Sequence, residues 1–317
     1  MPSQPGDIII SFGSLNQSPN QDNMAATQTI QVPHLDAQVG YAISNGKIDP
    51  SKPTTVLING MCVNVGMYRD QMASDRLTAA TNLLAIEPLG HGSTTCASEH
   101  FTYWDTALVA LQAMEALGVS KAFALGTSHG GWIVTRMALL APERIQGLIP
   151  LGTSMDMEST ESRLKGCWDP APFVTPFIQK WSIPAPDFVV GDDWIGTLVS
   201  LGLGSAATPG VTKFWTEQLR RTYSGDEGRK KIRMATICLT ERDGLLYRLG
   251  DIKCPVHWLQ GTNDAIYSTV IAKEQIEMFT GSRDAKIDIV EGGAHFLSAT
   301  NPKEVEEAIL GMVANVE

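Results

Sequence analysis

The chain has 317 residues, of which 43% are hydrophobic and 18% charged, enough for one large domain with or without an inserted segment. Its formal net charge of -10 excludes a general attraction to phosphate backbones, so we expect no nucleic-acid partner. The sequence contains no run of about 20 apolar residues, so we expect no insertion into a membrane.

The first residues predict a flexible arm followed by a hairpin. Residues 1–26 are rich in Ser, Asn, Gln and Pro, and they lack the basic start of a signal peptide. The stretches "TQTIQV" (27–32) and "AQVGYAIS" (37–44) flank "PHLD", which is typical of two strands joined by a turn.

Buried strands and amphipathic helices then alternate. The strand signals are β-branched and apolar runs at residues 54–60, 82–88, 121–128 and 145–154. The helical signals between and after them lie at residues 67–80, 103–118 and 131–145, the last of which we expect to stop at Pro142. This alternation predicts a parallel sheet with helices on both faces.

The alternation breaks between residues 155 and 249, where strand signals are few. This stretch holds four of the seven tryptophans in the chain: Trp168, Trp181, Trp194 and Trp215. They fit the core of a helical subdomain, and they fit equally a lid whose aromatic side chains line a substrate cavity. Strand signals return at residues 254–264 and 285–296, with helical signals at 268–279 and 301–316.

A Gly-x-Ser-x-Gly motif joins the strand at 121–128 to the following helix. The stretch "FALGTSHGGW" puts Ser128 between Gly126 and Gly130, at a strand-to-helix turn that would lift a serine hydroxyl above the sheet edge. The glycines leave room where such a turn is most crowded. The setting therefore indicates a catalytic nucleophile, whereas the motif by itself is common in ordinary loops.

A serine nucleophile needs a base and a carboxylate that orients the base. His295 follows the last predicted strand, and Asp264 follows the strand before it, so both would meet Ser128 at the carboxyl edge of the sheet. Asp156 and Glu158 follow the strand after the nucleophile helix and are rival candidates for the acid.

An oxyanion formed at Ser128 would need backbone N–H donors. We expect one donor at His129, directly after the nucleophile, and the other at Met61 or, less favoured, Cys62, after the strand at 54–60. The remaining histidines are interpreted as structural, with His91 as a hydrogen-bonding loop residue.

Several stretches resemble the landmarks of the α/β-hydrolase superfamily, in the expected order: "EPLGHGST", "GTSHGG", "APERIQGLIPLG", "LQGTNDAIY" and "GGAHF". The resemblance covers about residues 27–316. It implies a mostly parallel eight-stranded α/β sheet flanked by helices, with a core of residues 27–154 and 250–317 and a helical cap at 155–249. It also implies Ser128 as nucleophile, Asp264 as acid and His295 as base, with oxyanion donors at Met61 and His129.

The sequence departs from the family pattern at two places. Asn59-Gly60 stands where the family often has His-Gly. The family often has Asp before a Pro-Gly-His-Gly stretch, and here "EPLGHG" offers Glu87 and Leu89. Neither change removes a member of the predicted triad. A serine at position 128 also disfavours haloalkane dehalogenases and epoxide hydrolases of this fold, which use an aspartate there.

These features favour a serine hydrolase that cleaves an ester or lactone of a mid-sized apolar molecule. Cleavage of a thioester or a carbon–carbon bond, and acyl transfer to an alcohol, stay open because one triad serves all of them. A ligand-binding receptor and a cyclase or lyase are alternatives from other classes.

The sequence also leads to expectations about cofactors, the cellular compartment and the oligomeric state. We expect no cofactor and no metal, since the sequence has no phosphate loop, dinucleotide fingerprint or metal-ligand cluster. The cysteines are scattered without Cys-x-x-Cys spacing, which favours a reducing, cytoplasmic compartment: Cys62, Cys96, Cys167, Cys238 and Cys254. The acidic surface and apolar lid would permit a homodimer without specifying one.

Overall fold

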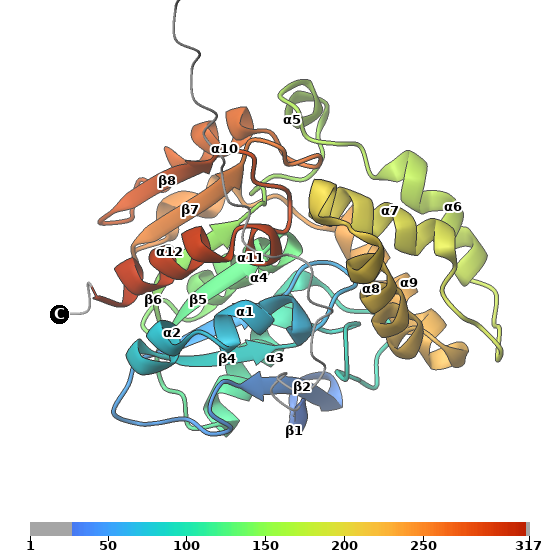
Figure 1. The fold of residues 1–317 in the computed structure, drawn as a ribbon, viewed down its shortest axis with the longest axis horizontal. Helices are drawn as coiled ribbons and strands as arrows, with labels where there is room; N and C mark the ends of the chain where they lie inside the picture. Colours follow the sequence, from blue (N-terminus) through green and yellow to red (C-terminus); the bar gives the residue numbers. More distant parts are fainter. Residues whose placement is uncertain (1–26, 315–317) are drawn as a thin grey trace, which may run out of the picture.

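The computed structural model describes residues 27–314, so the predicted arm at 1–26 lies outside the described residues. One eight-stranded sheet has the strand order β1-β2-β4-β3-β5-β6-β7-β8 (Figure 1). The strands are β1 Gln28–Val32, β2 Ala37–Ile43, β3 Thr54–Ile58, β4 Asn82–Ile86, β5 Ala122–Thr127, β6 Ile145–Leu151, β7 Val256–Gly261 and β8 Ala285–Val290.

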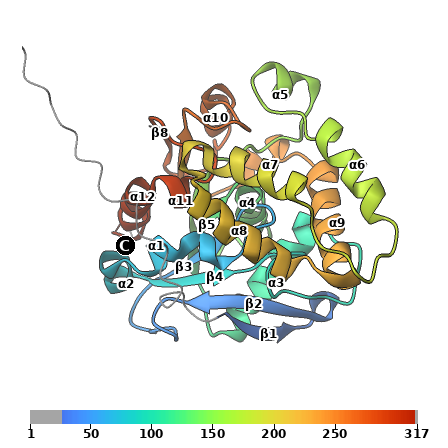
Figure 2. The same ribbon diagram turned by 45° about the vertical axis from the view of Figure 1, so that its right-hand side comes forward.

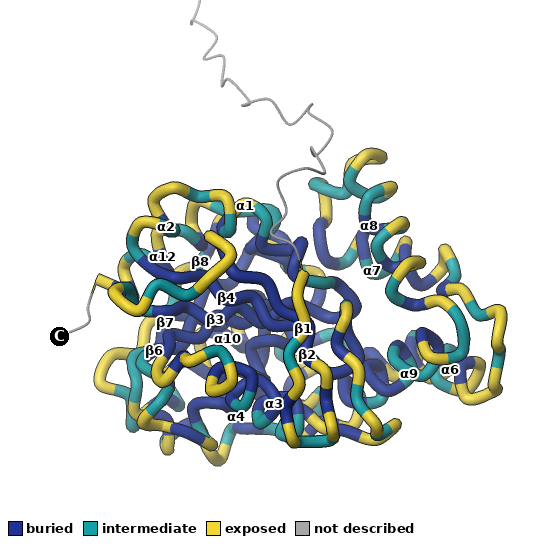
Figure 3. Tube along the Cα trace, turned by 90° about the horizontal axis from the view of Figure 1, so that it is seen from below, coloured by how far each residue is buried: buried dark blue, intermediate teal, exposed yellow. Residues whose placement is uncertain are grey.

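The sheet is mostly parallel. β1 pairs with β2, and β2 with β4, in antiparallel register, whereas every other neighbouring pair is parallel. The central strands β3, β4 and β5 are buried at every position, because helices cover both of their faces (Figure 3). The predicted mostly parallel eight-stranded sheet is confirmed.

Helices form a layer on each face of the sheet (Figure 1). One face carries α3 Tyr103–Ala116, α4 His129–Leu140 and α10 Thr269–Ile276, whose apolar side chains join one core cluster. The other face carries α1 Arg69–Met72, α2 Asp75–Ala80, α11 Leu297–Thr300 and α12 Pro302–Ala314, and its apolar side chains join a second cluster.

The helix predicted over residues 67–80 is wrong as one element. The chain forms a 3-10 turn at Val65–Tyr68, then α1, and then restarts as α2. The break falls at Ser74, whose hydroxyl accepts a hydrogen bond from the N–H of Leu77 and so caps a new helix. A local side-chain cap therefore overrides the longer apolar periodicity.

Five α-helices connect β6 to β7: α5 Thr160–Leu164, α6 Ala171–Trp181, α7 Asp192–Leu203, α8 Pro209–Thr222 and α9 Gly225–Glu241. We call residues 155–249 the cap segment. Figure 2 shows α6, α7, α8 and α9 grouped on one side of the sheet. The two ends of the segment meet, because the N–H of Leu245 donates to the carbonyl of Met155 at 2.7 Å.

The tryptophans of the cap segment divide between two environments. Trp181 lies 4.9 Å from Trp194, ring centroid to centroid, within an aromatic cluster that also contains Phe173 and Phe177. Trp181 and Trp215 pack in the interior of the helical layer, whereas Trp168 and Trp194 line the cavity beside Ser128. Core packing therefore accounts for Trp181 and Trp215, whereas the lid interpretation stays a prediction for Trp168 and Trp194.

Candidate active site

Ser128 sits at a sharp turn between β5 and α4. Its backbone has φ 55° and ψ -121°, a conformation that side-chain-bearing residues rarely adopt and that is often retained at functional sites. A Cβ on Gly126 would lie 2.1 Å from the carbonyl oxygen of Gly130, and one on Gly130 would lie 2.2 Å from that of Ile58. Only glycine fits at both positions, so the motif is required by the turn.

Three side chains predicted from sequence meet at the carboxyl edge of the sheet. His295 Nε2 lies 2.8 Å from Ser128 Oγ, and His295 Nδ1 lies 3.0 Å from both carboxylate oxygens of Asp264. The His295 and Asp264 side chains are only 5% and 0% exposed. Ser128 makes no helix-capping bond with its side chain, so its hydroxyl is free to pair with the imidazole.

The Asp264 carboxylate is oriented by several donors. Its Oδ1 accepts from the backbone N–H groups of Ile266 and Tyr267, and its Oδ2 accepts from Gln260 Nε2 at 2.8 Å. Burial raises the pKa of Asp264, but the attraction of His295 and these hydrogen bonds outweigh burial, so its pKa lies below the ordinary value. An ionised carboxylate suits the role of holding the Nδ1–H of an imidazole.

The rival carboxylates lie in other contacts. Asp156 accepts from the N–H of Met157 and the hydroxyl of Ser159. Glu158 pairs with Arg242 at 2.5 Å. Of the three carboxylates considered from sequence, Asp264 is the one that contacts His295.

The two expected oxyanion donors flank Ser128. His129 opens α4, so its backbone N–H has no acceptor within the helix. Met61 lines the same cavity as Ser128, and its N–H has no acceptor among residues 27–314. Asn59 steadies this loop by donating to the carbonyls of Gly60 and Val63 at 3.0 and 2.8 Å, a task that suits the amide found in place of histidine.

An apolar cavity opens beside Ser128 and His295. Its other lining residues come from the cap segment and the strand ends: Met61, Trp168, Phe173, Val174, Trp194, Thr197, Leu198, Leu201, Gly202, Leu239, Ile266, Tyr267 and Phe296. The free space is about 60 Å³, well below the roughly 300 Å³ or more of a pocket that encloses a drug-sized ligand. The free space of the cavity is therefore sufficient for a short apolar group.

One cap helix approaches the loop of His295 very closely. The carbonyl of Gly202 in α7 accepts from the N–H of Phe296 at 2.7 Å, and a Cβ on Gly202 would lie 2.3 Å from the Phe296 ring. The Phe296 ring centroid is 5.2 Å from that of His295. The spacing between α7 and His295 therefore depends on a glycine.

We expect Gly202→Ala to destabilise the fold by about 1–3 kcal/mol, because the new methyl group displaces the Phe296 ring. Gly196→Ala in the same helix is a matched control, since a Cβ there meets nothing within 4 Å. The control should stabilise by about 0.5–1 kcal/mol through helix propensity. Urea unfolding measures both changes, and equal midpoints for the two variants would contradict the expected crowding.

Two buried histidines, His91 and His129, lie next to each other near the turn at Ser128. The His91 and His129 rings are 4.6 Å apart, and His91 Nδ1 contacts the carbonyl of Leu89 at 3.0 Å. Burial lowers the pKa of His91 to about 4, and burial together with the charge of His91 lowers the pKa of His129 well below its ordinary value. Both rings are therefore neutral in the folded protein near neutral pH.

We expect stability to fall as the pH drops from about 6.5 towards 4. The unfolded chain protonates these histidines below about pH 6.5, whereas the folded chain does not. The stability that neutral His91 contributes is thus present above pH 6.5 and lost as pH falls through its folded pKa, by up to roughly 3 kcal/mol. Thermal unfolding from pH 7.5 to 4.5 should show a weaker pH slope for His91→Gln, and an unchanged slope would refute this assignment.

A larger hollow lies at the opposite end of the sheet. About 360 Å³ is enclosed near the amino ends of the strands by residues that include His257, Arg283 and Lys286. His257 is engaged there with Asp288 at 2.7 Å. None of the predicted site residues borders this hollow, whereas Ser128 and His295 border the smaller cavity.

Two features of membrane proteins and metalloproteins are absent from residues 27–314. No helix in this range is long and apolar enough to cross a membrane. Within the same range, no group of three or more His, Cys, Asp or Glu side chains is arranged to hold a metal ion.

The strand order and the strand-to-helix turn at Ser128 are those of the α/β-hydrolase fold. A family model described as alpha/beta hydrolase fold matches residues 53–170. The chain has the α/β-hydrolase fold that its resemblance to this superfamily predicts.

Individual relatives are distant. A protein assigned as the carbamate hydrolase RutD of Azorhizobium caulinodans is 24% identical over 271 residues, which are 83% of this chain and 92% of that protein. Another RutD, from Stutzerimonas stutzeri, is 26% identical over 157 residues, which are 48% of this chain and 56% of the relative's length. The crystal structure of the enol-lactonase from Burkholderia xenovorans LB400 superposes with a TM-score of 0.70 at 17% identity, over 88% of this chain and 97% of that chain. At that identity the likeness establishes a shared fold alone.

The sequence did not predict the polar groups that surround Asp264. Gln260 and Tyr267 lie four and three residues from Asp264 in the stretch "LQGTNDAIY". Their closeness to Asp264 can therefore be read from the sequence, but their hydrogen bonds cannot. Arg242 gave no signal, because it approaches Glu158 from 84 residues away.

Proposed function

We propose that this chain is a serine hydrolase that cleaves a carboxylic ester or lactone of an apolar small molecule. The observation that carries the proposal is the continuous hydrogen-bonded chain from Ser128 through His295 to Asp264, at the wall of an apolar cavity. Catalytic serines, bases and orienting carboxylates are recognised by this geometry.

In the first half-reaction, His295 Nε2 takes the proton of Ser128 Oγ as that oxygen attacks the substrate carbonyl. The backbone N–H groups of Met61 and His129 stabilise the resulting oxyanion. Collapse of the tetrahedral intermediate breaks the bond to the alcohol oxygen, which receives the proton from His295. Ser128 is left as an acyl ester.

In the second half-reaction, His295 takes a proton from water, which attacks the acyl-serine. The second tetrahedral intermediate releases the acid and returns the proton to Ser128. Throughout, the Asp264 carboxylate accepts the Nδ1–H of His295 and stabilises the imidazolium. The balance of atoms is ester plus water to acid plus alcohol, so no redox partner is required.

The cavity limits the size and the polarity of the substrate. Its lining is almost wholly aliphatic and aromatic, and its free space of about 60 Å³ fits a short acyl group. We therefore infer that short acyl esters turn over with the cap segment as it lies, whereas mid-sized substrates depend on outward movement of α6 and α7.

Similarity to proteins assigned as RutD favours a carbamate as the second candidate substrate. A carbamate differs from an ester by one nitrogen next to the carbonyl, and the same serine attack would cleave it. The comparison is made by assaying matched ester, lactone and carbamate substrates with one leaving group.

The test is intact mass after treatment with a fluorophosphonate, together with turnover of p-nitrophenyl acetate, butyrate and octanoate. We expect one covalent adduct per chain and faster turnover of the acetate and butyrate. Folded protein that takes up no label and cleaves no ester would refute the hydrolase proposal. Complete labelling without turnover of any ester, lactone or carbamate would favour a binding protein.

A further inference from the structure

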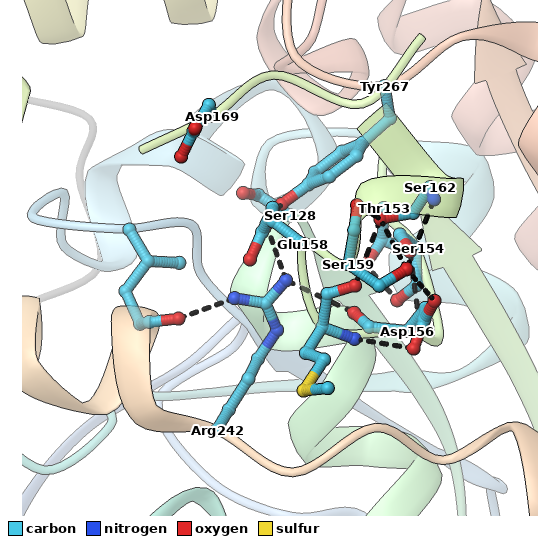
Figure 4. Close-up of polar contacts among 12 residues, drawn as sticks. Ser128, Thr153, Ser154, Asp156, Glu158, Ser159, Ser162, Asp169, Arg242 and Tyr267 are labelled. Atoms are coloured by element: carbon cyan, nitrogen blue, oxygen red, sulfur yellow. Dashed lines mark hydrogen bonds and ion pairs between the residues drawn. The ribbon is translucent and has the colours of Figure 1, made fainter. Parts of the chain in front are cut away.

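A buried ion pair joins the two ends of the cap segment. Arg242 follows α9, and its Nη2 lies 2.5 Å from Oε1 of Glu158 (Figure 4). The two side chains are only 1% and 7% exposed. Arg242 also donates to the carbonyls of Asp156 and Leu239, and its guanidinium lies 3.9 Å from the ring centroid of Trp132. Removing two charges from water is costly, so such a pair persists only with these added contacts.

The same carboxylate holds a side chain at the cavity wall. The hydroxyl of Tyr267 donates to Oε1 of Glu158 at 3.1 Å (Figure 4). Burial raises the pKa of Tyr267 well above its ordinary value, so the phenol keeps its proton and acts as a donor. Its ring lines the cavity beside Ser128, with its centroid 5.7 Å from that of His295.

The backbone of Tyr267 contacts the acid of the triad. Its N–H donates to Oδ1 of Asp264 at 3.0 Å. Its carbonyl accepts from Gln260 Nε2 at 2.9 Å, and the same amide donates to Oδ2 of Asp264. A shift of Tyr267 therefore moves two of the groups that aim the Asp264 carboxylate at His295.

We propose that Glu158 and Arg242 are positioning residues for the reaction, acting through Tyr267 on the cavity wall and on the loop that orients Asp264. The proposal rests on the proposed function, because it takes His295 as the base. A lock that only ties the two ends of the cap segment together would alter stability and leave kcat unchanged. The positioning role instead requires that loss of the Tyr267 hydroxyl lowers kcat.

Tyr267→Phe isolates the hydroxyl, because it keeps the ring and the backbone contacts. We expect kcat for p-nitrophenyl acetate to fall about 10-fold with little change in KM, since misalignment acts on the reacting groups. Fluorophosphonate should still label every chain, at a lower rate. Tyr223→Phe is the matched control, because its buried hydroxyl donates to the carbonyl of Gly90 at the same 3.1 Å and it does not line the cavity. The control should lose comparable stability and keep its kcat.

A paired variant, which changes both Glu158 and Arg242, tests whether the ion pair acts through the Tyr267 hydroxyl. Glu158→Leu with Arg242→Met removes both charges at similar volume, so no lone charge stays buried. If the pair acts through the phenol, adding Tyr267→Phe to this variant causes no further loss of kcat. The proposal would be overturned if Tyr267→Phe kept the wild-type kcat. It would also be overturned if the triple variant lost kcat by the fold-loss of Tyr267→Phe multiplied by the fold-loss of the paired variant.

These outcomes are separable from failure of the proposed function. A wild type that neither labels nor cleaves the ester contradicts the hydrolase assignment itself, and the positioning role falls with it. A wild type that labels, with Tyr267→Phe labelling equally fast, contradicts only the positioning role. If the paired variant does not fold, the comparison of Tyr267→Phe with Tyr223→Phe decides alone.

Discussion

Ser128→Ala is expected to lower kcat by at least about 10⁴-fold and to abolish fluorophosphonate labelling. The alanine keeps the backbone turn at φ 55° but removes the oxygen that lies 2.8 Å from His295 Nε2. The residual rate reflects only binding and oxyanion stabilisation. Intact mass and steady-state kinetics on p-nitrophenyl acetate measure both effects.

Ser154→Ala serves as the control for this change. Ser154 is also a buried serine at the carboxyl edge of the sheet, and its hydroxyl accepts from the N–H of Asp156 at 3.1 Å. This variant should label and turn over like the wild type. If Ser128→Ala still formed the adduct, the nucleophile would have to be another residue.

Asp264→Asn is expected to lower kcat by about 10⁴-fold. An asparagine amide donates to His295 Nδ1 where the carboxylate now accepts from it, and this favours the tautomer with the proton on Nε2. In that tautomer Nε2 cannot accept the proton of Ser128. The effect should appear in kcat, because the cavity lining does not include Asp264.

Asp156→Asn distinguishes Asp264 from the rival acid. Its carboxylate contacts Met157 and Ser159 and not His295, so this change should leave kcat near the wild-type value. Pre-steady-state acylation measured on both variants separates proton transfer from product release. A loss in Asp156→Asn as large as in Asp264→Asn would reassign the acid.

Much of the fold follows from local patterns. The apolar runs at 54–60, 82–88 and 121–128 contain β3, β4 and β5, because strands buried on both faces must be apolar throughout. Element ends were less predictable. The run at 285–296 continues past β8, which ends at Val290 because the chain turns at Gly292, where φ is 72°.

The candidate site was predictable where chain position decides it. Ser128, Asp264 and His295 each follow a parallel strand, and the carboxyl ends of such strands meet at one edge. The choice of Asp264 over Glu158 as the acid was not predictable from chain position, because both residues follow strands. Only tertiary contacts show which of the two reaches His295. Glu158 is engaged by Arg242, whose approach depends on how the helices of the cap segment pack.

The hydrogen bond between Leu245 and Met155 brings the two ends of the cap segment together. The segment is therefore a closed loop inserted between β6 and β7. Lengthening a closed loop costs little extra chain entropy, since the cost grows only with the logarithm of its length. Pairing of β6 with β7 therefore tolerates segments of other lengths and shapes between these two points. We therefore expect that the whole segment can be exchanged, with its ends kept, without disturbing the sheet that positions Ser128, Asp264 and His295.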